Sequence, residues 1–254
     1  MSDELIFETA DGVAILRINR PEVRNAIDGA TARAIAAAID ELDERDDLSV
    51  GVITGAGGTF CSGMDLRGFL AGDRPSIEGR GFAGLVQAPP RKPLIAAVEG
   101  YALAGGCEIA LACDIIVASE KATFGLPEPK RGLVPTGGGA LKLHKRLPYH
   151  VAMELLLTGK MFPAERAHHF GFVNHLVPEG TALEAALALA REIAANAPLA
   201  LEAIKQVVLQ SQDWSQAESH TLQTTLTAHV FRSADAREGS RAFAEKRPPV
   251  WTRS

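Results

Sequence analysis

Two glutamates stand in segments that otherwise carry little charge. Glu108 closes the glycine-rich turn 103–108, just after one apolar run, and Glu128 closes the segment 124–128, just after a second. A carboxylate in apolar surroundings is costly unless it is paired or protonated, so its pKa tends to rise toward neutrality. Two such groups brought together can serve as acid and base on one substrate if their surroundings separate their proton affinities. The pair therefore indicates general acid–base chemistry.

Glycines lie beside both glutamates, at Gly105, Gly106 and Gly125. Because glycine has no Cβ, backbone N–H groups in such turns can approach a substrate oxygen closely. The structural alternative is that a single glutamate at a helix start acts as a cap or dipole partner, and that glycine-rich turns are only turns. The joint pattern favours an active site over that alternative.

Composition limits the class of protein. A chain of 254 residues with 46% hydrophobic residues can form one large α/β domain, or a core with a small appendage. The net charge of −5 argues against general nucleic-acid binding, and no apolar run reaches the roughly 18 residues of a membrane span. Three cysteines (Cys61, Cys107 and Cys113) and an N-terminus without a targeting pattern predict reduced thiols in a cytoplasmic protein.

The elements that must position the glutamates begin with a hairpin. Two β-type runs, 5–9 and 13–18, are joined by Asp11-Gly12, which is a strong hairpin signal. Asp28 is suited to cap a helix that runs to about Arg45 with one apolar face. Further buried strands are expected at 50–54, 94–98 and 114–118, with a helix starting near Gly105. This alternation predicts right-handed crossovers in parallel or stacked sheet.

Beyond residue 137 the pattern is helical, with one short strand at 173–177. Helices are expected at 139–146, 150–158, 163–170, 180–196, 198–211, 214–231 and 235–245. We therefore expect a mixed α/β core with the active site over residues 1–178, followed by a helical C-terminal region over residues 179–254.

Several other functions are excluded. The turn after the strand at 50–54 lacks the third glycine of a dinucleotide fingerprint, because Phe60 stands there. The same Phe60 replaces the first glycine of a nucleophile elbow around Ser62. Neither Cys nor His residues show metal-ligand spacing, so no metal is expected.

A set of motifs, in one order and spacing over essentially the whole chain, resembles the enoyl-CoA hydratase/isomerase (crotonase) family. They are Asn19-Arg20-Pro21, Asn25-Ala26, Ile53-Thr54-Gly55, 60–66, 100–108, 124–128 with Gly132, and 242–247. The segment 127–135 and the ending 245–251 further resemble the branch that contains crotonobetainyl-CoA (carnitinyl-CoA) hydratases.

The resemblance implies a crotonase-like spiral of repeated ββα units with a helical C-terminal trimerisation region, in a homotrimer or homohexamer. It also implies an acyl-CoA thioester substrate, so that coenzyme A is part of the substrate and no cofactor is tightly bound. The thioester oxygen would lie between the backbone N–H groups of Met64 and Gly105. Removing one such donor typically lowers the rate about 10²–10³-fold. Asp65 matches a family acidic residue, and we expect it to brace the loop.

For a hydratase of this family, the resemblance gives each glutamate a role: Glu108 takes a proton from the attacking water, and Glu128 delivers one to the α-carbon. Coenzyme A would be bound by six residues, of which the last two would reach a neighbouring subunit's nucleotide: Val23, Arg24, Ala26, Arg67, Phe243 and Lys246.

Three alternatives stay open. The first is an enoyl-CoA isomerase or another enolate-forming acyl-CoA enzyme, such as a carnitinyl-CoA dehydratase. The second is an acyl-CoA binding protein without catalysis, which the intact pair of glutamates disfavours. A serine hydrolase of related fold is less favoured, since no histidine falls in a motif that would place it near Ser62. The irregular stretch 67–87, expected to line the acyl pocket, does not reveal the acyl group.

Overall fold

A six-stranded sheet organises the computed structural model, which describes residues 4–254. Residues 1–3 lie outside the described residues. They belong to the N-terminus that was expected to lack a targeting segment and to the expected core 1–178. The strand order is β1-β2-β3-β6-β8-β11. In chain order the strands are β1 Leu5–Ala10, β2 Val13–Ile18, β3 Val50–Gly55, β6 Leu94–Val98, β8 Ile115–Ser119 and β11 His175–Val177. The first two form the expected antiparallel hairpin, and all other neighbours pair in parallel.

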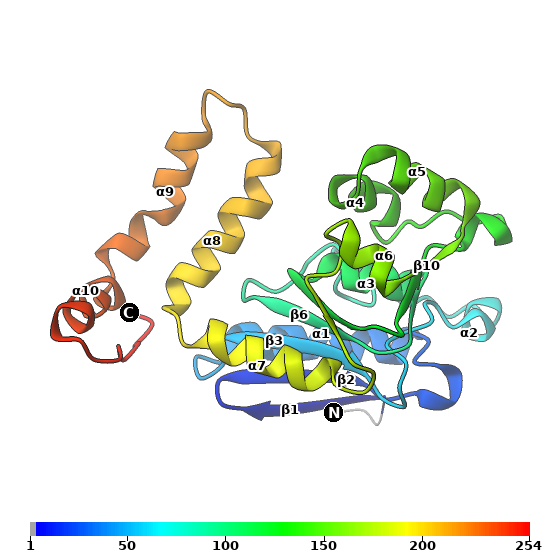
Figure 1. Cartoon of the computed structure of the whole chain (residues 1–254), viewed down its shortest axis with the longest axis horizontal. Coiled ribbons are helices and arrows are strands. Elements are labelled where there is room, and N and C mark those ends of the chain that lie inside the picture. Colours follow the sequence, from blue (N-terminus) through cyan, green and yellow to red (C-terminus); the bar gives the residue numbers. More distant parts are fainter. Residues whose placement is uncertain (1–3) are drawn as a thin grey trace.

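Helices cover both faces of this sheet (Figure 1). Helix α1 (Gly29–Glu44) begins as expected at Asp28, whose Oδ1 accepts a hydrogen bond from the Thr31 N–H at 2.8 Å. Helix α7 (Ala182–Ala194) packs small alanines against the opposite face. Because both faces are buried, the parallel strands read as continuous apolar runs rather than alternating ones.

A second, three-stranded sheet has the order β10-β9-β7, and no strand of it was expected from the sequence. Its strands are β7 Tyr101–Leu103, β9 Thr123–Gly125 and β10 Met161–Pro163. Each has only three residues, which is too short for an alternating pattern to be read. Strand β7 follows β6 and leads into helix α3 (Gly105–Ala112), and β9 follows β8 in the same way. This repetition confirms the expected ββα spiral.

The remaining elements connect these layers. Before α3 they are η1 Pro21–Val23, α2 Leu66–Leu70, β4 Ser76–Ile77 and β5 Gly81–Phe82; after β9 they are η2 Glu128–Arg131, α4 Gly139–Arg146, α5 Tyr149–Thr158 and α6 Ala164–His169. Helix α4 coincides with the expected range 139–146.

The C-terminal region is helical, as expected. It contains α8 (Pro198–Gln210), η3 (Ser211–Asp213), α9 (Ser219–Arg232) and α10 (Ala234–Glu245). Helices α8 and α9 form a hairpin that projects away from the sheet, and α10 follows at the end of α9 that is remote from the α8–α9 connection (Figure 1). The expected start of a helix at 214 was wrong, because a turn closed by Ser215 and Glu218 precedes α9.

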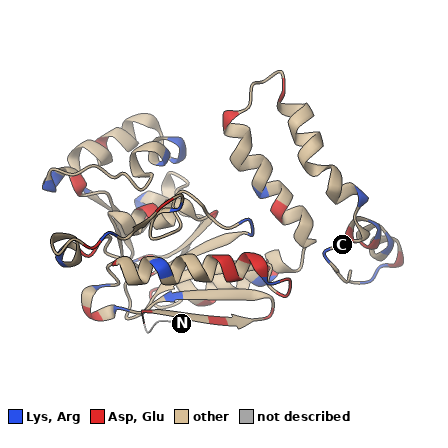
Figure 2. Cartoon of the chain, turned by 180° about the vertical axis from the view of Figure 1, so that it is seen from behind, with Lys and Arg blue, Asp and Glu red and all other residues tan. Residues whose placement is uncertain are grey.

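Figure 2 shows that charged residues are sparse along α8 and α9. None of the helices over residues 4–254 is long and apolar enough to cross a membrane.

Candidate active site

Glu108 lies in the first turn of α3 and faces the start of α4. Its Oε1 accepts a hydrogen bond from the Gly139 N–H at 2.9 Å, and the residue is 4% exposed. A Cβ on Gly137 would lie 2.4 Å from Oε2, so only glycine leaves room for this carboxyl group. Burial raises the pKa of Glu108 from 4.5 to about 7; the Gly139 hydrogen bond opposes the rise, and the charge of Glu128 adds to it. The surroundings of Glu108 thus bring the pKa of its carboxyl group close to neutral pH.

Glu128 is the first residue of η2, directly after β9 and the turn 126–127. Its Oε2 is buried and has no hydrogen-bond partner among the described residues. Burial raises the pKa of this carboxyl group too. A buried carboxyl oxygen without a partner is uncommon in folded proteins and favours a site that a ligand completes.

The loop that carries Met64 lies against the start of α3. Gly105 is the first residue of α3, and a Cβ on Gly63 would lie 3.2 Å from its nitrogen, so the segment that leads to Met64 runs directly along the helix start. Neither Met64 nor Gly105 donates its N–H to a hydrogen bond within residues 4–254. Ala104, just before Gly105, has φ of 50°, a conformation that costs free energy for a residue with a side chain. The arrangement can receive an oxygen that develops negative charge.

The segment containing Val23, Arg24 and Ala26 lies beside the Met64 loop. The Ser62 N–H donates to the Arg24 carbonyl at 3.0 Å, and Ile27 pairs with Met64 in an isolated parallel bridge. Four of the six residues expected to bind coenzyme A are therefore near the candidate site, because Arg67 follows in the first turn of α2.

Asp65 braces this loop, as expected. Its Oδ1 accepts hydrogen bonds from the backbone N–H groups of Arg67 at 3.1 Å and Gly68 at 3.3 Å. Its Oδ2 pairs with Arg20 at 3.2 Å. All three contacts hold the backbone that carries Met64 and Arg67.

Phe243 and Lys246 are not brought to the glutamates of their own chain. Phe243 lies on α10 with 88% of its surface exposed, and Lys246 is the C-cap of that helix. Helix α10 and helix α2 lie at opposite sides of the molecule (Figure 1).

Sequence reasoning missed the glycines that receive Glu108 and a phenylalanine beside Gly105. The run Gly137-Gly138-Gly139 was a visible signal, because three glycines before a helix imply close approach. A Cβ on Gly105 would lie 2.3 Å from a carbon of the Phe82 ring. No pattern in the irregular stretch 67–87 pointed to Phe82.

A cavity of about 320 Å³ adjoins these residues. It is lined by Ser76, Ile77, Glu78, Gly79, Gly81, Phe82, Gln87, Thr136 and Gly137. Since Gly137 contacts Glu108 and Phe82 contacts Gly105, this cavity borders the candidate site.

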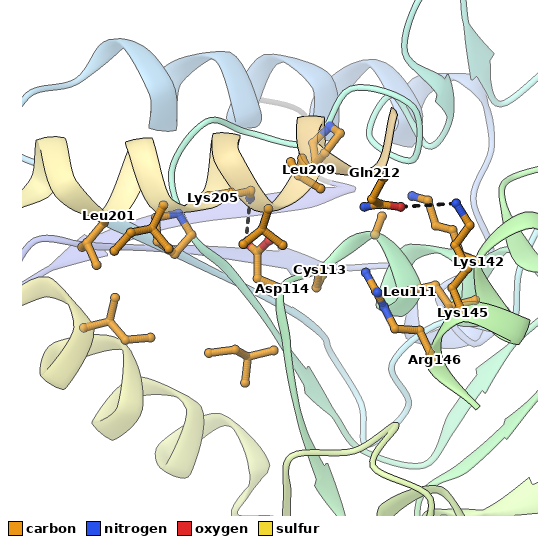
Figure 3. Close-up of a pocket in the computed structure, with 17 residues that line it drawn as sticks. Leu111, Cys113, Asp114, Lys142, Lys145, Arg146, Leu201, Lys205, Leu209 and Gln212 are labelled. Carbon is orange, nitrogen blue, oxygen red and sulfur yellow. Dashed lines mark hydrogen bonds and ion pairs between the residues drawn. The ribbon is translucent and has the colours of Figure 1, made fainter. Parts of the chain in front are cut away.

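A larger apolar cavity, of about 380 Å³, lies between α8 and the C-terminal ends of α3 and α4 (Figure 3). Leu201 and Leu209 line it from α8, and Lys145 and Arg146 line it from α4. Neither glutamate lines this cavity. It is therefore a feature of the contact between the helical region and the core.

The three cysteines are free and buried. Burial raises the pKa of each thiol, including that of Cys107 beside Glu108. A thiol that resists ionisation is a poor nucleophile, so Cys107 acts as a small buried apolar residue.

Comparison with known proteins gives consistent results. Residues 8–254 match the family described as enoyl-CoA hydratase/isomerase. Enoyl-CoA hydratase EchA19 of Mycobacterium tuberculosis is 42% identical over 257 residues, which cover 97% of this chain and 95% of that protein. The carnitinyl-CoA dehydratase of Proteus mirabilis is 39% identical over 259 residues, covering 99% of each.

A solved structure agrees with the fold. The crystal structure of enoyl-CoA hydratase EchA1 from Mycobacterium marinum has a TM-score of 0.98 and 52% sequence identity, and the comparison covers 100% of both chains. The resemblance drawn from the motifs is confirmed, including its branch near the carnitinyl-CoA enzymes. This protein therefore belongs to the enoyl-CoA hydratase/isomerase (crotonase) family.

Proposed function

We propose that this protein is an enoyl-CoA hydratase, a hydro-lyase that reversibly adds water to a 2-enoyl-CoA thioester and forms the 3-hydroxyacyl-CoA. One observation carries the proposal: two carboxyl groups with raised pKa values, the buried Glu108 and the half-buried Glu128, lie close enough for the charge of Glu128 to raise the pKa of Glu108. Hydration needs both a base for the water and an acid for the α-carbon.

The proposed chemistry uses the two carboxyl groups in opposite protonation states. The ionised Glu108 takes a proton from water as the water oxygen bonds to C3, and the protonated Glu128 gives its proton to C2. The C2–C3 double bond supplies the electron pair for the new C2–H bond. Exchange with solvent then restores both groups. Burial raises the pKa of both carboxyl groups, and at Glu108 the hydrogen bond from the Gly139 N–H opposes that rise and favours the ionised form.

Enolate stabilisation falls to the N–H groups of Met64 and Gly105. Negative charge moves onto the thioester oxygen when the nucleophile adds to C3, and two converging donors stabilise that charge. Gly105 stands at the N-terminus of α3, where the helix dipole adds partial positive charge.

Coenzyme A is proposed to bind along the loops around Val23, Arg24, Ala26 and Arg67, with Phe243 and Lys246 supplied by a neighbouring subunit. Two features support a homotrimer, alone or paired into a hexamer. Large apolar side chains are exposed on the projecting hairpin, among them Ile204 and Phe231. Helix α10 also lies far from its own site (Figure 1). Three buried free thiols fit a reducing cytoplasm.

The test is the loss of conjugated enoyl-thioester absorbance with crotonyl-CoA, for the native enzyme, Glu108→Gln and Glu128→Gln. We expect each substitution to reduce turnover by about 10²–10⁴-fold, since each removes one proton-transfer step, while circular dichroism stays unchanged. Undiminished hydration by both variants would contradict the proposal. Loss in only one variant would favour an isomerase or another enolate reaction.

A second candidate is dehydration of carnitinyl-CoA. The observation that favours it is the 39% identity to the carnitinyl-CoA dehydratase of Proteus mirabilis, over 99% of both chains. The same two glutamates would serve, because dehydration is the reverse reaction on a different acyl group. Comparing kcat/KM for 3-hydroxybutyryl-CoA and carnitinyl-CoA decides between them. Binding of acyl-CoA without turnover of either would leave a non-catalytic binding protein.

A further inference from the structure

Phe82 is carried by a very small hairpin. Strands β4 and β5 have two residues each, and Phe82 pairs with Ser76 across the hairpin. So few ladder hydrogen bonds give little stability by themselves. The position of Phe82 must therefore depend on contacts that the hairpin makes with other elements.

Those contacts come from two helices. On one side, the Arg80 guanidinium donates hydrogen bonds to both carboxylate oxygens of Asp40 on α1, at 2.7 and 2.8 Å. It also donates to the Gly84 carbonyl at 2.9 Å. On the other side, the Nζ of Lys142 on α4 donates to the Val86 carbonyl at 3.0 Å. Since the start of α4 also binds the carboxyl group of Glu108, Phe82 and Glu108 share one support.

The Phe82 ring lies directly on Gly105. A Cβ on Gly105 would lie 2.3 and 2.4 Å from two carbons of the ring. The same ring lines the cavity of about 320 Å³, to which Gly105 itself does not contribute. The Phe82 ring therefore separates that cavity from Gly105, the residue proposed to bind the thioester oxygen.

We propose that Phe82 determines which acyl groups the site accepts, because its ring closes the path from the thioester to the cavity and limits the native enzyme to short 2-enoyl groups. This inference rests on the proposed hydratase function. The cavity beyond the ring is largely polar, with Ser76, Glu78, Gln87 and Thr136 in its lining. An aliphatic chain in that cavity would remove those groups from water without offering hydrogen bonds, so the gain expected on truncating Phe82 comes from the space that the ring fills beside Gly105.

The experiment compares crotonyl-CoA, 2-hexenoyl-CoA and 2-octenoyl-CoA as substrates of the native enzyme, Phe82→Leu and Phe82→Ala. Each CH2 that leaves water for an apolar surface improves binding about fourfold, so two give about fifteenfold. We expect the kcat/KM ratio of 2-hexenoyl-CoA to crotonyl-CoA to rise up to about fifteenfold in Phe82→Ala and less in Phe82→Leu. Phe170→Ala, at another half-buried phenylalanine next to α6, is the matched control and should leave the ratio unchanged.

A binding measurement separates this inference from the proposed function. Titration calorimetry with butyryl-CoA and hexanoyl-CoA requires no turnover, so it tests Phe82 even if the native enzyme hydrates no enoyl-CoA. A gain for hexanoyl-CoA in the Phe82 variants supports the inference. Unchanged ratios in both turnover and binding, in folded Phe82→Leu and Phe82→Ala, would overturn it.

Discussion

At the scale of single residues, the carboxyl group of Glu108 is under opposing influences. Burial and the charge of Glu128 favour its protonated form, whereas the Gly139 N–H and the charge of Lys142 favour the ionised form. Burial dominates, and the pKa reaches about 7. Efficient general bases have pKa values near the working pH, so this balance matches the proposed role.

The pH dependence of kcat/KM tests that balance. Because the base must be ionised and its pKa is raised, activity should fall about tenfold per pH unit below about pH 7, rather than below the usual 4.5. Rates measured from pH 5 to 9 with crotonyl-CoA check this, and constant activity from pH 8 down to pH 5 would contradict the role of Glu108.

At the scale of elements, the junction between α3 and α4 decides the geometry of the site. Glu108 stands in the first turn of α3, and α4 begins at the glycines that receive its carboxyl group. The two helices are joined through a side chain and a backbone N–H, at 2.9 Å. A small change in the start of α4 is therefore transmitted directly to the proposed base, Glu108.

Gly137→Ala should displace that carboxyl group. The new Cβ would lie 2.4 Å from Oε2 of Glu108, and misplacement of a catalytic group by about 1 Å can cost about 10²-fold in rate. We expect a loss of that order in kcat, with the melting temperature nearly unchanged. Gly239→Ala, in α10, is the control, because its Cβ would meet only the Trp251 ring at 3.3 Å. Equal activity of the two variants would show that activity does not depend on the close contact between Gly137 and the Glu108 carboxyl group.

At the scale of the whole molecule, the projecting hairpin is joined to the core through buried polar contacts. The Nζ of Lys205 on α8 donates to the Lys92 carbonyl at 2.9 Å and to Asp114 at 2.6 Å. Lys92 in turn donates to the Leu42 and Arg45 carbonyls at the end of α1. These contacts fix the direction in which α8 leaves the core.

Lys205→Met should therefore lower the free energy of unfolding. Removing one partner of a buried ion pair leaves the other uncompensated, and we expect a cost of about 3 kcal/mol, at the lower end of the usual range, because Asp114 is partly exposed. Lys145→Met, which loses only an exposed hydrogen bond to Gln212, should change stability by less than about 0.5 kcal/mol. Denaturant titration of both variants measures the difference.

Mixed oligomers test whether the C-terminal region completes a neighbour's site. Alone, Glu108→Gln should lack the base, and Lys246→Ala should bind coenzyme A esters weakly. If Lys246 serves the adjacent subunit, oligomers refolded from a mixture should regain activity at low substrate, since some sites would combine an intact Glu108 with an intact Lys246. Activity equal to the average of the separate variants would place Lys246 outside any shared site.

The sequence by itself determined the family, both glutamates and the elements with strong local signals. The hairpin at Asp11-Gly12 and the helix capped by Asp28 depend on neighbouring residues alone, so both were predicted nearly to the residue. The motifs likewise pointed to Glu108 and Glu128 as candidates, since a charged residue in an apolar segment is visible in the chain itself.

Only the tertiary structure decided what surrounds those residues. The three-residue strands β7, β9 and β10 are held by pairing between distant segments, which leaves no local pattern. The contact of Gly137 with Glu108 and of Phe82 with Gly105 likewise joins residues more than twenty positions apart. The identity of a catalytic group can be read locally because it is a property of the side chain. The pKa of that group, the residues that hold it in place and the residues that line its cavity all depend on how distant elements pack against one another. Only the tertiary structure determines that packing.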